Sequence, residues 1–242
     1  MAKLRINGDS SGYVDLEAPN AASSSTLDLD QVPQKNVANT FTTGQNITVP
    51  TNGGLTIQAG TNGSASLRLK NDATDWDVNC QTSDNFAIYN HTTGGNRLGI
   101  TPAGIVTTPS QPSFWATVSN DYTGYNSTDY SSGLIFNTAL YNIGGHYSTS
   151  TGRFTAPVTG TYLLTAECYT TGQVWDQSWF TLNGSRPNGT DHVQNGQAIV
   201  GNTSTIKLNA NDWVMFHPYS GNTNNLIKAA PQHTWFKGIL LG

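Results

Sequence analysis

Short apolar pairs, with one residue between the two members and turn residues after them, recur in the N-terminal part of this 242-residue chain. Both side chains of such a pair point to the same face of a β-strand, because alternate residues of a strand share a face. The pairs are Leu4/Ile6, Val14/Leu16, Leu27/Leu29, Ile47/Val49, Leu55/Ile57, Leu67/Leu69, Phe86/Ile88 and Leu98/Ile100. No window of about eleven residues shows an apolar period of about 3.6 residues. The sequence therefore predicts an all-β protein.

These strands are too short to close a core within one chain. Each contributes little apolar area, and the Gly-, Asn- and Ser-rich loops between them lose entropy when they become ordered. We therefore expect identical chains to share the burial around a rotation axis, as an intertwined or stacked β-fibre. A small free-standing β-sandwich with long loops is the alternative.

Prolines indicate the domain boundaries. Pro102, Pro109 and Pro112 fall within one short stretch, where they fix φ and keep the chain extended, so we place a boundary near residue 110. Pro33 and Pro50 bracket a second, polar stretch. The predicted organisation is a docking segment at 1–35, a β-rich shaft at 36–109 and a single β domain at 110–242.

Composition limits the classes of partner. Charged residues make up 11% of the chain, the net charge is −4, and the basic residues are scattered, so we expect no nucleic-acid partner. No apolar run approaches the ~18 residues of a spanning helix, and we expect no membrane insertion. The first residues show no apolar leader, so we expect folding in a cytoplasm, with Cys80 and Cys168 as free thiols.

The C-terminal part carries a series of motifs in a fixed order. They are PSFWATVS (112–119), LIFNTALYNIGGHYSTSTGRFTAPVTGTYLLTAE (134–167), SWFTLNG (178–184), STIKLNANDWVMFHPYSG (204–221) and HTWFKGILLG (233–242). The most specific pieces are Asn142 with Gly144 and Tyr147, the block TGRFTAPVTGTYLL, the pattern L-x-x-x-D-x-V, and the closing Phe236-x-Gly238-x-Leu240-Leu241. In this order the motifs resemble the C1q/TNF-like jelly roll. Asn211-Asp212 departs mildly from the Gly-Asp that is usual in that family.

The resemblance implies a jelly-roll head and a compact homotrimer, so the predicted fold is a trimeric β-shaft followed by a C1q/TNF-like head. It also implies a turn through Pro157 and Gly160, in which Pro157 ends pairing and Gly160 adopts a positive φ. Core positions are predicted at Phe114, Phe154, Tyr162, Leu164, Phe216 and Phe236.

Two upstream segments resemble parts of bacteriophage tail-fibre and other virion proteins, notably of phages that infect cyanobacteria. The first is NGDSSGYVDLEAPNAASSSTLDLDQVP, and the second contains SLRLKNDATDWDVNC, DNFAIYN and NRLGITPAGIV. This resemblance implies a virion protein, assembled in the host cytoplasm, whose N-terminal segment attaches to baseplate, tail or capsid proteins.

Catalytic and metal-binding patterns are weak. One tight acidic cluster, Asp72, Asp75 and Asp77, offers carboxylates of the kind that cleave polysaccharides, but we expect it in a solvated turn. An EF-hand is excluded, because Cys80 and Phe86 occupy the positions that require Gly and Glu. Calcium bound through Asp121, Asp129 or Asp191 stays an alternative. The histidines occur singly and no nucleophile motif is present, so we expect no cofactor, no metal and no enzymatic activity.

Aromatic residues among small polar ones favour a recognition surface in the head. Rigid rings supply contact area, and neighbouring polar groups supply hydrogen bonds. The candidates in NDYTGYNSTDYSSG are Tyr122, Tyr125, Asn126, Asp129 and Tyr130, and those elsewhere are Trp175, Asp176 and Tyr219. Packing at an edge or at a subunit interface is the alternative for each ring.

Two functions fit this layout. The first is a trimeric tail fibre whose head binds a host-cell receptor, with a surface glycan as the expected class. The second is a trimeric capsid decoration protein, which the short chain favours. A polysaccharide depolymerase is disfavoured, because the short irregular strands cannot form a groove-bearing β-helix.

Overall fold

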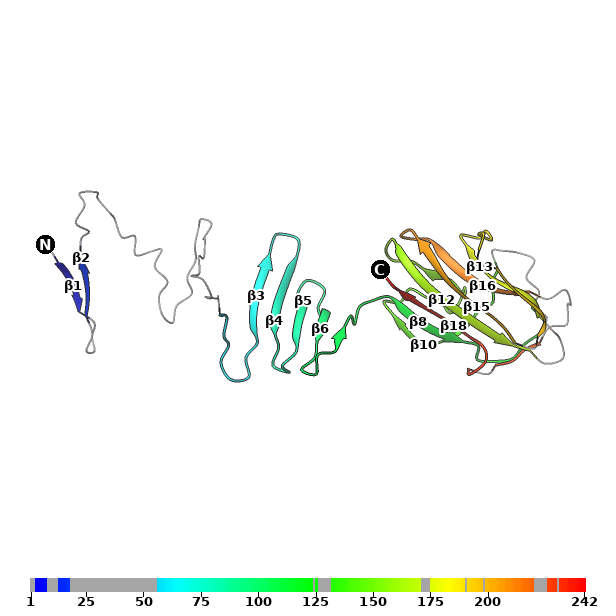
Figure 1. Ribbon diagram of the computed structural model, residues 1–242, viewed down its shortest axis with the longest axis horizontal. Helices are drawn as coiled ribbons and strands as arrows, with labels where there is room; N and C mark the ends of the chain where they lie inside the picture. Colours follow the sequence, from blue (N-terminus) through cyan, green and yellow to red (C-terminus); the bar gives the residue numbers. More distant parts are fainter. Residues whose placement is uncertain are drawn as a thin grey trace. The chain divides into compact units, whose positions relative to one another are not determined.

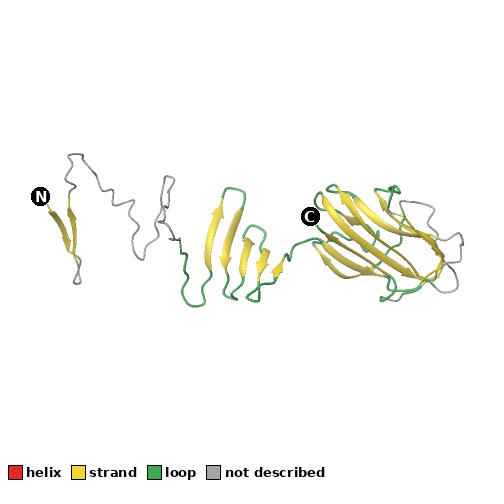
Figure 2. Cartoon of the chain, viewed as in Figure 1, coloured by secondary structure: helices red, strands yellow, loops and turns green. Residues whose placement is uncertain are grey.

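The structure, a computed structural model, describes residues 3–7, 13–17, 56–123, 125, 132–170, 175–189, 191–197, 199–219, 226–229 and 231–242. For 3–7, 13–17, 175–176 and 193–197 it describes the backbone alone. Within these residues the structure contains strands and no helix, and therefore no helix that is long and apolar enough to cross a membrane (Figures 1 and 2). The all-β prediction is confirmed. The chain divides into two compact units, Met1–Thr56 and Ile57–Gly242, while the predicted boundaries at 35 and 109 stay predictions.

In the first unit, strands β1 (Lys3–Asn7) and β2 (Tyr13–Glu17) form an antiparallel hairpin. Leu4 pairs with Leu16, and Ile6 pairs with Val14. Two of the predicted apolar pairs thus lie on strands that face each other. The pairs predicted at 27/29 and 47/49 fall outside the described residues, as does Leu55.

The second unit begins with a five-stranded antiparallel sheet in which each strand pairs with the next (Figure 1). Its strands are β3 (Ala65–Lys70), β4 (Asp75–Cys80), β5 (Phe86–Asn90), β6 (Asn96–Ile100) and β7 (Val106–Thr107). We call this sheet the shaft sheet. Strands β3, β5 and β6 carry three predicted apolar pairs, whereas Ile57 lies in no strand.

The prediction that the acidic cluster lies in a turn is wrong for two of its three members. Asp72 lies in the bend after β3, but Asp75 and Asp77 lie on β4. Trp76 and Val78 alternate with the two carboxylates, so the segment has the period of two that a strand needs. The pairing of Trp76 with Leu69, and of Val78 with both Leu67 and Ile88, places β4 inside the sheet.

The shaft sheet has one apolar and one polar face, because residues paired across neighbouring strands lie on the same side. The apolar face consists of Leu67, Leu69, Trp76, Val78, Phe86, Ile88, Leu98, Ile100 and Val106. Leu69 is 56% exposed and Val106 is 61% exposed. On the polar face, Asp77 is only 7% exposed and Ala87 is fully buried. In a single chain, the apolar face is thus the more open of the two.

The head of the second unit is a two-layered β-sandwich (Figure 1). The first sheet has the order β10 (Thr138–Ile143), β8 (Ser113–Thr117), β18 (Trp235–Leu240), β12 (Gly160–Tyr169) and β15 (Ile199–Leu208). The second has the order β11 (Phe154–Thr155), β16 (Trp213–Tyr219), β13 (Trp175–Leu182) and β14 (Asp191–Gln197). Strands β9 (Tyr122–Thr123) and β17 (Leu226–Ile227) form a small separate pair.

The burial pattern of strand β12 explains the alternation of apolar residues with other residues in its sequence. Tyr162, Leu164, Ala166 and Cys168 are buried, whereas the residues between them are only half-buried. The adjacent Glu167 and Cys168 therefore point to opposite faces. Burial raises the pKa of the Cys168 thiol well above its ordinary value, and the charge of Glu167 adds to this rise.

An aromatic cluster fills the space between the two sheets. The Phe114 ring stacks on Tyr147 at a centroid distance of 4.6 Å and on Phe154 at 5.0 Å, and it meets Phe236 edge to face at 4.8 Å. Phe180 of the second sheet stacks on Phe236 at 5.7 Å. The core prediction is confirmed, because its six residues are at most 1% exposed: Phe114, Phe154, Tyr162, Leu164, Phe216 and Phe236.

The motif residues of the head have local structural roles. The Asn142 side chain accepts a hydrogen bond from Tyr147 N at 3.1 Å and donates one to Tyr147 O at 2.8 Å, which closes the turn after β10. Gly144 in that turn has φ 84°, a conformation that costs glycine little. Asn211, which replaces the usual Gly, has φ 73°, and Asn tolerates this region better than most residues.

Two positions of the first sheet have no room for a side chain, and both are occupied by glycine. A Cβ at Gly238 would lie 2.4 Å from Phe114 Cε1 and 2.8 Å from Leu164 Cδ2. At Gly160, a Cβ would lie 2.7 Å from Leu240 Cδ1. The prediction of a positive φ at Gly160 is wrong, since Gly160 is the first residue of β12 and does not adopt that conformation.

Substitution of Gly238 by Ala is expected to destabilise the head. The added methyl group overlaps the Phe114 ring, which is held by three other rings and cannot move aside, so we expect a loss of about 1–3 kcal/mol in the free energy of unfolding. Chemical denaturation of the full chain measures this loss. Gly60→Ala is the matched control, because a Cβ there meets nothing within 4 Å. Equal unfolding midpoints for the two variants would contradict the close packing.

The two cysteines are expected to differ in reactivity. Both are free; Cys80 is exposed and Cys168 is fully buried. Cys168 should stay unlabelled in the native protein and react with a chromogenic aromatic disulfide only in denaturant, because the thiolate is the reactive form and Cys168 is kept as an inaccessible thiol. Cys80→Ser should abolish labelling of the native chain. Rapid labelling of that variant would show that Cys168 is accessible.

Candidate functional sites

The small β9–β17 pair holds the start of the predicted recognition segment. Thr123 pairs with Leu226, and Tyr122 pairs with Ile227. Beside them, Asp121 forms an ion pair with Lys228 and accepts a hydrogen bond from Ala229 N at 2.8 Å. The bond from Lys228, and to a lesser degree that from Ala229, lowers the pKa of Asp121. The carboxylate thus ties two segments that are far apart in the sequence.

The structure separates the first two predicted recognition tyrosines. Tyr122 is 43% exposed, whereas Tyr125 is 6% exposed and belongs to the hydrophobic core. Their rings meet edge to face at 6.0 Å. The interpretation of Tyr125 as a surface contact is therefore corrected, because its ring is packed inside the single chain. Tyr122 stays a candidate for recognition.

The remaining predicted residues are only partly described. Asn126, Asp129 and Tyr130 lie outside the described residues. Trp175 and Asp176 lie at the start of β13, and only their backbone is described.

Tyr219 lies at the end of β16 in an aromatic group. Its ring lies 5.7 Å from Trp179, which stacks on His217 at 5.9 Å. The Arg186 guanidinium covers Trp179 at 4.0 Å and donates to Asp191 Oδ1 at 2.7 Å. The half-buried Tyr219 is thus held in a packed group, which agrees with the alternative of packing at an edge.

The acidic residues of β4 each bind a different basic side chain. Arg68 forms a bidentate pair with Asp75, at 2.7 Å from Nε and 2.5 Å from Nη2. This pair lowers the pKa of Asp75, with smaller contributions from Lys70 and His91. Asp77 contacts His91 Nε2 at 2.8 Å. Within the described ranges, no group of three or more His, Cys, Asp or Glu side chains is arranged to hold a metal ion.

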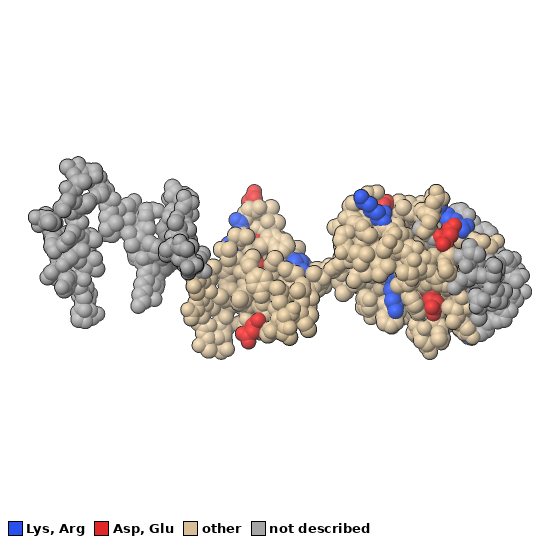
Figure 3. All heavy atoms as spheres, in the orientation of Figure 1, with Lys and Arg blue, Asp and Glu red and all other residues tan. Residues whose placement is uncertain are grey.

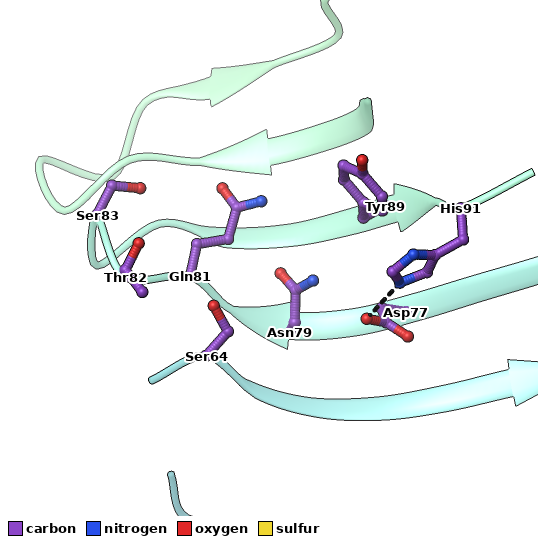
Figure 4. A pocket seen from close by; sticks show the side chains of 8 residues that line it. All are labelled: Ser64, Asp77, Asn79, Gln81, Thr82, Ser83, Tyr89 and His91. Atoms are coloured by element: carbon purple, nitrogen blue, oxygen red, sulfur yellow. Dashed lines mark hydrogen bonds and ion pairs between the residues drawn. The ribbon is translucent and has the colours of Figure 1, made fainter. Parts of the chain in front are cut away.

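A pocket lies on the polar face of the shaft sheet, above β4 and β5 (Figure 4). Its volume is about 440 Å³, and it is lined by Ser64, Asp77, Asn79, Gln81, Thr82, Ser83, Tyr89 and His91. Asp77 and Asn79 are two residues apart on β4 and therefore point to the same face, and Tyr89 pairs with Asp77 across to β5. We call this the shaft pocket.

Two oxygen atoms of residues that line the shaft pocket are buried and have no hydrogen-bond partner among the described residues: Asp77 Oδ1 and Asn79 Oδ1. Asp77 is 7% exposed and Asn79 is 8% exposed. In contrast, the nearby Gln81 amide forms a reciprocal pair with Asn96, at 2.9 and 3.2 Å. Because buried polar groups are normally hydrogen-bonded, these two oxygens are exceptions within the shaft sheet.

The shaft pocket was not among the predicted sites, although the sequence contains a usable signal. Asp77 and Asn79 alternate with apolar residues, as do Tyr89 and His91 around Asn90, and a strand assignment for residues 75–80 would have placed them on one face. Because this segment was predicted as a turn, the shared face was not recognised. The pairing of β4 with β5 also depends on tertiary structure, which periodicity alone does not define.

Charged side chains are few in the visible described surface, and they are scattered among uncharged ones (Figure 3).

Residues 113–241, which form the sandwich, match the C1q domain family. The chain belongs to the C1q family. The match covers more than half of the sequence, and the C1q-like domain has the jelly-roll fold that the motifs predicted. Domains of this kind are commonly trimeric and bind ligands, and C1q/TNF-like families are non-enzymatic ligand-binding or structural proteins.

Solved structures with this type of domain share little sequence with the chain. The globular domain of zebrafish complement 1qA is 17% identical, with a TM-score of 0.41, and the match covers 55% of this chain and 98% of that one. Murine APRIL at pH 8.5 is 13% identical, with a TM-score of 0.40 and coverages of 54% and 99%. Rabbit GITRL is 9% identical, with a TM-score of 0.35 and coverages of 54% and 94%. No curated protein matches the chain.

Tyr122 and Tyr125 of the C1q-like domain are expected to respond differently to truncation. Tyr125→Ala should lower the free energy of unfolding by about 3–5 kcal/mol, because it empties a site in the core. Tyr122→Ala should change it by roughly 0.5 kcal/mol, as is usual for exposed positions. Urea denaturation of both full-length variants measures the difference. A large loss for Tyr122→Ala, or a small one for Tyr125→Ala, would reverse the assignment of surface and core.

Proposed function

We propose that this chain is a bacteriophage virion protein, a trimeric tail fibre whose C1q-like head binds a receptor on the host cell. The proposed receptor class is a cell-surface glycan. Residues 1–35 attach the fibre to other virion proteins, and residues 36–109 form its shaft. The protein performs no enzymatic step and resides in the virion after assembly in the host cytoplasm. The resemblance of the upstream segments to phage structural proteins supports this assignment.

The open apolar face of the shaft sheet is the observation that carries the proposal. Leu67, Leu69, Phe86 and Val106 are 39–61% exposed on this face in the single chain. Burial of apolar area stabilises association by roughly 25 cal/mol per Å² before the costs of ordering. Three copies that turn these faces toward a common axis would bury them together, as we expect for strands that are too short to close a core within one chain. Domains of the C1q type are commonly trimeric, so head and shaft would share one symmetry.

Trimeric assembly also suits recognition by weak contacts. Each head presents the Tyr122 ring, which is 43% exposed and follows Asp121 in the sequence. A half-exposed ring with polar neighbours can stack on a sugar while the neighbours form hydrogen bonds. Linked copies convert weak single-site binding into avidity, so several such heads on one particle hold a cell more firmly than one.

Immunoelectron microscopy of particles from a phage that encodes the chain tests the proposed location. An antibody against residues 110–242 should label the tail. The same antibody, preabsorbed with purified chain, is the control and should label nothing. Label over the capsid would overturn the tail-fibre proposal in favour of a capsid decoration protein.

Competition for adsorption tests the proposed recognition. Purified full-length chain, shown by light scattering to have the mass of a trimer, should reduce adsorption of the phage to its host. Tyr122→Ala should lose most of this competition. Val158→Ala is the matched control, because Val158 is 47% exposed in the turn after β11. Undiminished adsorption in the presence of saturating wild-type trimer would contradict a role in host binding.

A further inference from the structure

The outward side of the first sheet of the head is open, whereas the outward side of the second sheet is covered within the single chain. Outward residues of the second sheet are at most 2% exposed: Trp179, Thr181, Met215 and His217. On the first sheet, Tyr141 is 44% exposed, Ile143 38% and Ile239 41%. The register with β8 places these three side chains on one side, away from the core, and we call this side the open face. Apolar residues grouped on an exposed face indicate a surface that a partner covers.

The open face also carries the few charges of the first sheet. Its five strands, all described, contain three charged side chains: Glu167, Lys207 and Lys237. Each of them alternates with residues that point to the core, so all three lie on the open face. Lys207 is exposed, whereas Glu167 and Lys237 are half-buried. A partner that covers this face therefore removes water from one cation and one carboxylate.

The Lys237 ammonium is held in place by two indole rings. It lies 4.0 Å from the ring centre of Trp115 and 4.2 Å from that of Trp235. Cation–π attraction fixes its position without using its hydrogen-bond donors. Within the described part of the chain, no carboxylate lies within ion-pair distance of it.

Glu167 is likewise without a counter-charge in the single chain. It pairs with Trp235 across to β18, which makes it a diagonal neighbour of Lys237, yet the two side chains form no ion pair. The Glu167 carboxylate also forms no hydrogen bond with a described residue. With Trp235 it lines a pocket of about 420 Å³, and none of the lining residues is Lys or Arg. The carboxylate thus has room beside it for a cation from outside the chain.

We propose that the open face docks on a second copy of the same head, and that Glu167 of one copy forms an ion pair with Lys237 of the next. This pairing rests on the trimeric assembly of the proposed function. Charge complementarity selects the occupant, because an apolar partner would leave both charges buried and unpaired, at a high cost. In a closed ring, each Glu167 meets the Lys237 of a neighbour, so no charge on the covered face lacks a partner.

Zero-length carbodiimide cross-linking of the full-length chain tests the pairing, because the reagent joins a carboxylate to an amine only when the two are in contact. Trimers are reassembled from an equal mixture of unlabelled and isotope-labelled chains. Mass spectrometry of the digest should find Glu167 joined to Lys237 in peptides that combine a labelled half with an unlabelled half. Such mixed peptides arise only from a contact between chains.

Charge reversal gives a second, independent readout. Glu167→Lys and Lys237→Glu each place like charges opposite each other, and each should raise the concentration at which the trimer dissociates about tenfold or more. A mixture of the two variants should recover part of this loss, because opposite charges then meet between unlike chains. Recovery cannot come from a contact within one chain, since both positions of each variant carry the same sign. Asp72→Lys, in the exposed bend after β3, is the control and should leave dissociation unchanged.

Several results would overturn the pairing. The cross-link is absent from a folded trimer, or it occurs only within one chain, or it joins Glu167 to Lys207. Equal dissociation of the wild type and both reversed variants would count against it as well. A monomeric wild type, seen by light scattering, would contradict the trimeric fibre together with the pairing. A cross-linked trimer that does not compete for adsorption would contradict the proposed host binding alone.

Discussion

The packing of the Phe114 ring against Gly238 is the constraint on which the head depends. Phe114 lies on the first strand of the sandwich and Gly238 on the last, so their contact joins the two ends of the domain. The same ring also stacks on Tyr147 and Phe154, which belong to other segments. This close approach is feasible only without a side chain at position 238. The closing motif of the family thus has a steric basis, and the Phe114 ring connects this contact to Tyr147 in the turn that Asn142 closes.

Periodicity and motif order predicted much of the architecture, because both report on local geometry. The pairs Leu67/Leu69 and Phe86/Ile88 lie on strands, and the buried positions of β12 follow its alternation. Features that depend on tertiary contacts were harder to predict. The polar residues of β4 indicated a turn, although its pairing partners make it an inner strand. Tyr125 looked like a loop residue by composition, and its burial depends on packing that composition does not encode. Gly160 was explained by a turn conformation, but it is needed for space beside Leu240.

The shaft sheet combines the two main surfaces of the molecule. On one face, Leu69 and Val106 are open in the single chain; on the other, Asp77 and Asn79 are buried around a polar pocket. In the proposed fibre, the first face turns toward the axis and the second toward the surroundings. The sheet then acts as the wall of the fibre, with its apolar face buried at the axis and its polar face toward the solvent. The head adds its own exposed ring at Tyr122.

The alternation of side chains along β4 has an evolutionary consequence. Trp76 and Val78 contact one face of the sheet, whereas Asp77 and Asn79 serve the other, although all four are consecutive in the sequence. A mutation at Asp77 or Asn79 alters the pocket lining and leaves the apolar face intact. Selection can therefore change the lining of the pocket without altering assembly. Neighbouring positions of one strand thus contribute to two properties, the pocket lining and the apolar face, that can change independently.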